Sequence, residues 1–348
     1  MRARWIRLGR LPPDTFYASA QAVAECLTEG ASPVVLWGRC ERGHLCIGAG
    51  QDAAAELDLD ACRRRDLAVF RRPLGGGTVF VDPWQWCFFL VVPRTAATRP
   101  RSRFLAQCLA PAAATFAGFG IVTKPAGGAD LWVEGRKILG SGAASIGVAQ
   151  VWGASFLLRF DAVAFAAVVR VPHAGFRDWL REELEAGMTD WTRQGALPDP
   201  DDLEVRFRRE VAVAFGWRVT DSELSAAERG AIPAAREELA DALGGGGRRR
   251  VCGGIKIRHR AYLVERGGAG GTIRLVLRDG RIVRVGWWPA GGGEGGGELR
   301  GAWALRPGPL AAALRGALGA ETAAAVAESA ARLAVRILEE ADDEPTDD

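Results

Sequence analysis

Lysine is scarce in this chain of 348 residues, which has 45 basic residues but only three lysines, Lys124, Lys137 and Lys256. Arginine supplies nearly every positive charge, so a lysine that is kept has a better than usual chance of a specific role. The formal net charge is only +3, which is too small to predict a nucleic-acid partner from bulk charge.

Long hydrophobic runs and a regular cysteine framework are also lacking. The longest apolar runs, such as residues 87–92, are far shorter than the roughly 20 residues that span a bilayer as a helix. The N-terminal residues MRARWIRLGRLPP do not read as a secretory signal. The seven cysteines are odd in number and contain no CxxC, which predicts reduced thiols. We therefore expect a cytoplasmic protein without a membrane partner.

Short apolar runs alternate with stretches of helical periodicity, which predicts a mixed α/β organisation. Helices are expected over residues 14–29, 53–66 and 103–119, and a mainly helical part over residues 162–215. The stretch ADLWVEGRKILGSG reads as two strands joined at Glu134-Gly135.

Glycine marks a boundary further along the chain. The run Gly244 to Gly247 reads as a linker. Beyond it, Asp279-Gly280 predicts a hairpin, and a closing amphipathic helix carries Val326, Ala330, Leu333 and Ile337. We predict a first domain over residues 1–243 and an accessory domain over residues 248–348 with an acidic tail.

Two stretches carry candidate chemistry. The segment RRPLGGGT places Arg71 and Arg72 beside Gly75, Gly76, Gly77 and Thr78, and suits a phosphate or carboxylate because arginine and exposed amides both donate to anions. A flexible turn beside two solvated arginines is the alternative. The second stretch, Asp130 to Gly142, contains Lys137, whose compact ammonium can lie between two oxyanions. A surface lysine on a strand is its alternative.

These stretches together resemble the biotin/lipoate protein ligase family, in its lipoate-protein ligase A branch. Residues 46–82 are similar to the first block of that family, and residues 129–147 are similar to its lysine block. The similarity covers roughly residues 16–216, and the region after the glycine linker resembles the family's small accessory domain more weakly. The resemblance implies an α+β fold, like class II aminoacyl-tRNA synthetases and BirA, with a mixed, mostly antiparallel sheet.

The resemblance also implies an ATP-dependent ligase. Lipoate would attack the α-phosphate of ATP to form lipoyl-AMP, and a carrier lysine would then displace AMP. Lys137 corresponds to the family's catalytic lysine. Arg71, Arg72, Gly75 to Gly77, Thr78, Gly140 and Ser141 correspond to positions that bind the adenylate, and Asp130 to the carboxylate that faces the nucleotide or Mg²⁺. The implied acceptor is a GcvH-like protein, an E2 lipoyl domain or a lipoate-binding protein of sulfur metabolism, and the ligase is expected to be a monomer.

Four positions depart from the family pattern. Leu74 replaces Ser or Thr, Val81 replaces His, Ala129 replaces Asn, and Gly153 stands where a histidine is common. These losses of polar groups leave an alternative open, namely a non-catalytic or shifted-substrate member that binds lipoyl or octanoyl groups, or a cysteine-dependent octanoyltransferase. The acceptor, the acyl preference and the role of the accessory domain do not follow from the sequence.

Two other clusters bear on metal and nucleic-acid binding. Cys40, His44 and Cys46 lack a fourth ligand for structural zinc, so no zinc site is expected. The basic residues 248–250 and 256–260 have no interleaved aromatics for base stacking, which favours a solvated face or a dock for an acidic carrier over a nucleic-acid site.

Overall fold

The computed structural model describes residues 1–97, 100–241, 251, 253–268, 271–290 and 296–342. The chain divides into two compact units, which are Met1–Arg177 with Leu184–Gly247, and Asp178–Glu183 with Arg248–Asp348. The described residues leave out several parts of the sequence, among them the predicted linker at residues 244–247, the arginines 248–250, Cys252 and the last six residues of the acidic tail. The domain boundaries at residues 243 and 248 stay a prediction.

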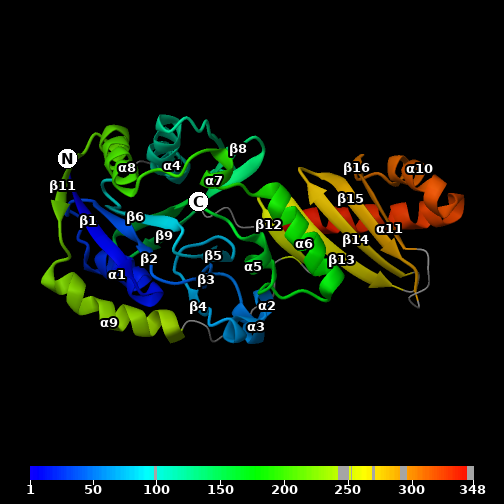
Figure 1. The fold of residues 1–348 in the computed structure, drawn as a ribbon, viewed down its shortest axis with the longest axis horizontal. Coiled ribbons are helices and arrows are strands. Elements are labelled where there is room, and N and C mark those ends of the chain that lie inside the picture. Colours follow the sequence, from blue (N-terminus) through cyan, green and yellow to red (C-terminus); the bar gives the residue numbers. More distant parts are fainter. Residues whose placement is uncertain (98–99, 242–250, 252, 269–270, 291–295, 343–348) are drawn as a thin grey trace. The chain divides into compact units, whose positions relative to one another are not determined.

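An eight-stranded sheet forms the centre of the first unit (Figure 1), in the order β11-β1-β2-β6-β10-β9-β8-β7. The pairs β1/β11 and β1/β2 are parallel, and the other pairs are antiparallel. The strands are β1 (Arg2–Leu11), β2 (Val34–Cys40), β6 (Gln85–Pro93), β7 (Lys124–Ala126), β8 (Asp130–Val133), β9 (Arg136–Ile146), β10 (Ala149–Leu157) and β11 (Arg218–Ser222).

Helices cover both faces of this sheet. On one face, α1 (Pro13–Cys26) packs against α9 (Ala226–Asp241), and on the other α4 (Arg101–Gly118) packs against α8 (Pro200–Phe215). Strand β2 shows why. Val34 and Leu36 belong to the hydrophobic core between the sheet and helices α1 and α9, which we call the α1 core. Val35 and Trp37 belong to the core between the sheet and helices α4 and α8, which we call the α4 core. Side chains alternate between the faces of a strand, so a strand buried on both sides is apolar throughout.

A smaller sheet carries the residues around the glycine turn. Its order is β4-β3-β5, with β3 parallel to β4 and antiparallel to β5. The remaining elements of this part of the chain are β3 (His44–Ile47), β4 (Ala68–Arg71), β5 (Val79–Val81), α2 (Ala53–Glu56), α3 (Leu59–Arg64), α5 (Ala162–Ala166), α6 (Ala174–Gly187) and α7 (Trp191–Gln194).

The described residues of the second unit form an antiparallel meander in the order β12-β13-β14-β15-β16, together with two C-terminal helices and the Asp178–Glu183 part of α6. Asp279 and Gly280 have positive φ angles of 48° and 73°, as a two-residue turn between β14 and β15 requires, so the predicted hairpin is confirmed. The elements are β12 (Gly254–Arg258), β13 (Ala261–Gly268), β14 (Gly271–Arg278), β15 (Arg281–Trp288), β16 (Gly297–Trp303), α10 (Pro307–Leu318) and α11 (Ala320–Asp342).

The α+β class with mostly antiparallel sheets is confirmed, and so are the helices expected near residues 14–29 and 103–119. The segment 53–66 differs, because it forms two short helices instead of one. Leu57 bridges to Val169, and the Asp58 carboxylate accepts a hydrogen bond from the Ala61 amide at 2.9 Å. This cap starts α3 and interrupts the helical path.

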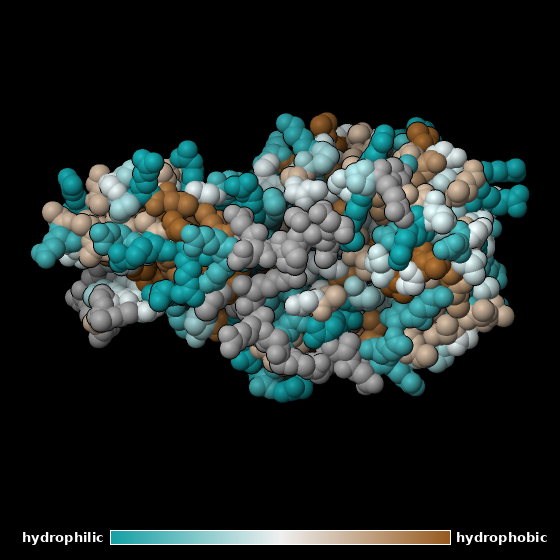
Figure 2. Space-filling view, turned by 180° about the vertical axis from the view of Figure 1, so that it is seen from behind, coloured by the Kyte–Doolittle hydropathy of each residue, from teal (hydrophilic) through white to brown (hydrophobic). Residues whose placement is uncertain are grey.

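Hydrophobic side chains lie in small separate areas between hydrophilic ones on the face drawn in Figure 2. Within the part of the chain that the structure describes, no helix combines the length and the apolar character needed to cross a membrane.

Candidate active site

A tight hairpin positions the candidate lysine. Glu134 and Gly135 have φ angles of 49° and 78°, which confirms the predicted turn between β8 and β9. The register sets Asp130 opposite Gly140. The Lys137 ammonium Nζ lies 2.9 Å from Asp130 Oδ1, and the two side chains are 23% and 11% exposed. The hairpin therefore holds a mostly buried ion pair in which the lysine is the more exposed partner.

Gly140 provides the space that the lysine side chain occupies. A Cβ atom at residue 140 would lie 2.7 Å from both Cε and Nζ of Lys137, and 3.5 Å from Asp130 Oδ1. Carbon atoms in contact normally stay about 3.5–4.0 Å apart. Any side chain at residue 140 would push the ammonium away from its position beside Asp130.

The two arginines before the glycine turn have different surroundings. Arg72 is buried, and its guanidinium donates to the carbonyls of Cys46 at 2.9 Å, Gly75 at 3.0 Å and Gly77 at 2.7 Å. Arg71 is half-buried and donates to the carbonyl oxygens of Ala49, at 3.2 Å, and Gln51. Arg72 therefore stabilises the glycine turn through hydrogen bonds in the interior. Arg71 stabilises the segment that follows β3.

The glycine turn lies directly against β9 and the end of β3. The Gly75 amide donates to the Ala143 carbonyl at 3.3 Å. A Cβ atom at Gly142 would lie 2.8 Å from the Gly75 carbonyl oxygen, and one at Gly48 would overlap the carbonyl of Gly76. The structure thus brings the two predicted stretches together by contacts that leave no room for side chains.

The outer part of the turn remains accessible. Gly76 and Gly77 are exposed, and Gly76 has a φ of 98°, which disfavours any residue with a Cβ. Nothing lies within 4 Å of a Cβ placed on Gly77. Thr78 follows the turn in the chain, and its hydroxyl donates to the Gln51 side-chain oxygen at 3.2 Å. A ligand can approach this backbone closely.

Ser141 has an internal hydrogen bond. Its amide and its hydroxyl both donate to the Ala129 carbonyl, at 3.1 and 2.6 Å. The serine thereby links β9, which carries Lys137, to the segment that precedes Asp130.

The departures at Leu74, Val81 and Gly153 share one apolar environment. Leu74 and Val81 are each 4% exposed and belong to the α1 core together with Phe89. A Cβ at Gly153 would lie 2.6 Å from the Phe89 ring and 3.7 Å from Leu74 Cδ2. Phe89 therefore fills the space above Gly153, so packing replaces polar groups here and leaves the turn and Lys137 in place.

The described cysteines are poorly suited to nucleophilic chemistry. Cys40, Cys46, Cys62, Cys87 and Cys108 are buried, and Cys26 is exposed at the end of α1. Burial raises the pKa of the Cys87 thiol to about 12, and it raises the pKa of Cys40 and Cys108 as well. These thiols stay protonated at neutral pH.

His44 is buried between aromatic rings. Its Nε2 lies 3.3 Å from the Tyr17 hydroxyl, and its Nδ1 lies 3.3 Å from the Arg42 carbonyl. Burial lowers the pKa of His44 to about 4. The imidazole is therefore neutral at pH 7 and packs in the core.

Three contributors to the site were not identified from the sequence. Gly48 and Gly142 allow the close backbone contacts, and the Thr189 amide donates to the Lys137 carbonyl at 2.9 Å. The GAG run before Gln51 was a local signal for Gly48. Thr189 carries no local signal, because its contact exists only in the folded chain.

Asp130 is the carboxylate beside the lysine. Among the described residues, no three metal-binding side chains come together as a cluster. A single carboxylate suits a Mg²⁺ ion that takes most of its other ligands from phosphates or water.

Comparisons with known proteins bear on the family. Lipoate-protein ligase A subunit 1 of Thermoplasma acidophilum is 26% identical over 186 residues, covering 49% of this chain and 69% of the relative. Octanoyltransferase LipM of Kyrpidia tusciae is 29% identical over 212 residues, covering 53% and 76%. The structure of a bipartite lipoate protein ligase and its E2 lipoyl domain from Thermoplasma acidophilum matches with a TM-score of 0.65 and 20% identity, covering 71% of this chain and 99% of that one.

A family model described as the lipoyl protein ligase A/B catalytic domain matches residues 17–210, more than half of the chain. This span contains the glycine turn, Asp130 and Lys137. The chain belongs to the family of lipoyl protein ligase A/B catalytic domains.

Proposed function

We propose that the protein is an ATP-dependent lipoate-protein ligase. The observation that carries the proposal is the position of the Lys137 ammonium, which pairs with Asp130 and lies against Gly140. The same strand, β9, packs against the glycine turn. A lysine ammonium, a carboxylate and an exposed glycine turn on packed strands support the proposal, in a chain of this family.

In the first half-reaction, a lipoate carboxylate oxygen attacks the α-phosphorus of MgATP, and pyrophosphate leaves. Negative charge develops on the oxygens around the α-phosphorus. Lys137 would neutralise it, and the exposed amides around Gly76 and Gly77 would orient the acyl-phosphate. Fixed donors of this kind typically contribute about 10²–10³ in rate each.

In the second half-reaction, the ε-amine of a carrier lysine attacks the acyl carbon of lipoyl-AMP. The amine forms the amide bond and loses a proton to solvent, and AMP leaves. The same ammonium would stabilise the acyl oxygen as the tetrahedral intermediate forms. Asp130 would keep Lys137 oriented between the two steps.

The proposed acceptor is a lysine on a small carrier domain, such as a lipoyl domain or a GcvH-like protein. A Thermoplasma ligase of the same fold is known with its E2 lipoyl domain, which supports this class of partner. A lipoate-binding protein of sulfur metabolism has the same acceptor chemistry.

A second candidate is octanoyl transfer from one carrier to another through a cysteine. The similarity to an octanoyltransferase favours it. The buried cysteines with raised pKa oppose it, because a thioester intermediate requires a thiolate that reaches the substrate.

The test incubates the protein with MgATP and lipoate and searches for lipoyl-AMP by mass spectrometry, before and after a carrier domain is added. The expected result is lipoyl-AMP that is consumed when the carrier becomes lipoylated. Lys137→Ala is the negative variant, and Lys124→Arg on β7 is the matched control. Acyl transfer from an octanoylated carrier without ATP would contradict the proposal and favour the second candidate.

A further inference from the structure

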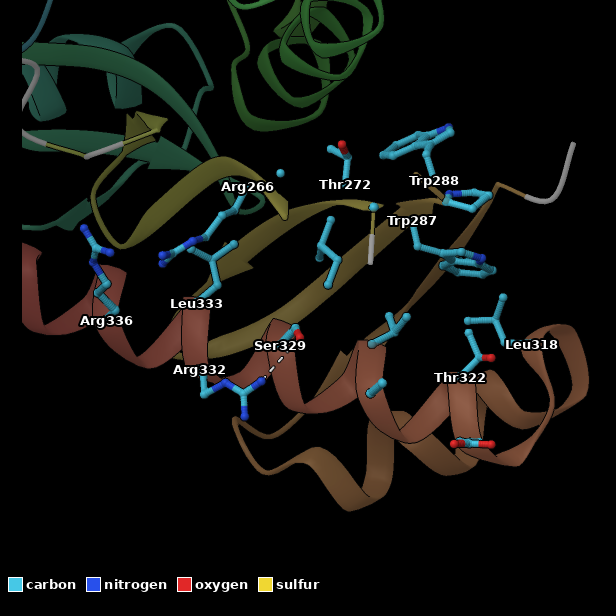
Figure 3. A pocket seen from close by; sticks show the side chains of 17 residues that line it. Arg266, Thr272, Trp287, Trp288, Leu318, Thr322, Ser329, Arg332, Leu333 and Arg336 are labelled. Carbon is cyan, nitrogen blue, oxygen red and sulfur yellow. Dashed lines mark hydrogen bonds between the residues drawn. The ribbon is translucent and has the colours of Figure 1, made fainter. Parts of the chain in front are cut away.

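The second unit contains a cavity of about 860 Å³ between its sheet and α11. Figure 3 shows this cavity, which we call the α11 cavity. Its walls come from the ends of β13, β14 and β15 and from the length of α11, with Leu318 of α10 at one end. Its volume lies within the range of roughly 300–1,000 Å³ that is common for small-molecule sites. All its lining residues belong to one unit.

The two ends of the α11 cavity differ in chemistry. Arg266 from β13 and Arg336 from α11 lie at one end, on opposite walls (Figure 3). Trp287, Trp288 and Leu318 lie at the other end, beside Thr322. A ligand that matches both ends is amphipathic, with an anionic group at the arginines and an apolar group at the tryptophans.

The α11 cavity is lined by aliphatic as well as polar side chains. Ile273, Val326 and Leu333 line it together with Thr272, Ser329 and Arg332, and Ile273 and Val326 are only partly buried at the edge of the core. Covering such surface gains about 25 cal/mol for each Å² removed from water. The lining along α11 runs from Glu321 to Arg336, which corresponds to about 22 Å of helix at 1.5 Å per residue. This wall suits an extended chain.

The charges at the arginine end favour an anion. Arg266 is exposed and forms no ion pair within the described residues. Arg336 pairs with Glu340 at 2.7 Å, one turn further along α11. An incoming carboxylate would share Arg336 with Glu340 and meet the Arg266 guanidinium from the opposite wall.

Packing at the tryptophan end disfavours a nucleotide. The Arg274 guanidinium lies 4.6 Å from the centre of the Trp288 ring, and Trp287 is only 6% exposed, with the Gly297 backbone against its ring. A base would have to displace these contacts in order to stack. An aliphatic chain needs only the surface of Val326, Leu333 and Ile273.

We propose that the α11 cavity binds a long-chain aliphatic carboxylate. The carboxylate lies between Arg266 and Arg336, and the chain runs along Val326 and Leu333 toward Leu318. This site is separate from the residues around Lys137 and does not depend on their proposed reaction.

The experiment uses the full chain and hexadecanoate, with binding measured by calorimetry below the aggregation concentration of the lipid. The double variant Arg266→Gln/Arg336→Gln should weaken binding at least about tenfold, since charge-assisted hydrogen bonds are among the strongest. Arg281→Gln, an exposed arginine of the same unit away from the cavity, is the matched control and should bind as the wild type does. Hexadecylamine, with the same chain and the opposite charge, should bind at least about tenfold more weakly.

A diazirine-bearing hexadecanoate locates the site independently. The crosslink should fall on α11 around residues 325–333 or on Ile273 and should disappear in Val326→Trp, which fills the cavity. Thermal unfolding checks that this variant folds. Equal binding of the amine, an unchanged affinity of the arginine variant, or crosslinks confined to residues 1–177 would overturn the proposal.

Discussion

Replacing Gly140 with alanine should move the candidate catalytic ammonium without unfolding the protein. The new Cβ would lie 2.7 Å from Lys137 Cε and Nζ, about 1 Å closer than carbon atoms normally approach. The lysine side chain is flexible at that end, so it will move while the strand stays in place. The ammonium then leaves its position 2.9 Å from Asp130.

The expected loss of activity follows from that displacement. A misplacement of about 1 Å in a reacting group can cost about 10²-fold in rate, which corresponds to about 2.7 kcal/mol in the activation free energy. The effect on stability is smaller. The Lys137 and Asp130 side chains are 23% and 11% exposed, so their ion pair contributes somewhat more than the roughly 1 kcal/mol of an exposed pair, and replacing glycine with alanine within a strand gains roughly 0.5–1 kcal/mol. The free energy of unfolding should therefore fall by no more than about 2 kcal/mol.

The assay measures lipoate-dependent pyrophosphate release together with thermal unfolding. Gly230→Ala in α9 is the matched control, because its Cβ meets nothing within 4 Å, and it should retain full activity. A double-mutant cycle sharpens the test: in the Lys137→Ala background, Gly140→Ala should add almost no further loss. Near wild-type activity in Gly140→Ala, or full additivity of the two losses, would refute the role assigned to the lysine position.

Three further predictions concern the turn and the core. Arg72→Lys keeps the charge but loses the planar fork that reaches three carbonyls, so urea unfolding should show a loss of about 1–3 kcal/mol, and an unchanged midpoint would contradict this. Gly76→Val places a β-branched residue at a φ of 98° and should abolish calorimetric binding of a non-hydrolysable lipoyl-adenylate, whereas unchanged affinity would remove the turn from the site. Burial lowers the pKa of His44 to about 4 from 6.5, so the unfolded chain binds a proton that the folded chain excludes between these pH values. The free energy of unfolding should fall by up to about 3 kcal/mol as the pH drops through this window, and His44→Phe should remove that dependence in denaturant titrations at pH 4 to 7.

The hairpin that carries Lys137 could be predicted from local sequence. Glu134-Gly135 favours a tight turn, and alternating residues on both sides favour paired strands. The contact between Lys137 and Gly140 could not be predicted in the same way. It depends on the register of β8 and β9, which shifts between Leu131 and Trp132, and on the direction in which the lysine folds back.

The roles of Arg71 and Arg72 show a second limit of sequence reasoning. Adjacent arginines look equivalent in the sequence, and the family resemblance implies that both bind the adenylate. In the fold, successive residues of an extended segment point to opposite sides. Arg72 therefore enters the interior and binds carbonyls, while Arg71 stays half-buried.

The apolar substitutions show a third limit. Leu74, Val81 and Gly153 are far apart in the sequence, and each looks like a separate loss of polarity. Only the folded chain shows that Leu74 and Val81 belong to the core of Phe89, and that the Phe89 ring occupies the space above Gly153. The four residues Leu74, Val81, Phe89 and Gly153 lie on different segments, so no local sequence pattern indicates that their packing replaces the polar groups.

The most direct test of the proposed adenylation is the lipoate-dependent exchange of labelled pyrophosphate into ATP, measured without any carrier. This exchange isolates the first half-reaction, since it requires reversible formation of lipoyl-AMP. The wild type should catalyse exchange only when lipoate and Mg²⁺ are present, Lys137→Ala should be slower by roughly 10² or more, and Lys124→Arg should match the wild type. A folded wild-type protein that catalyses no exchange, or a Lys137→Ala variant that exchanges at the wild-type rate, would contradict the account.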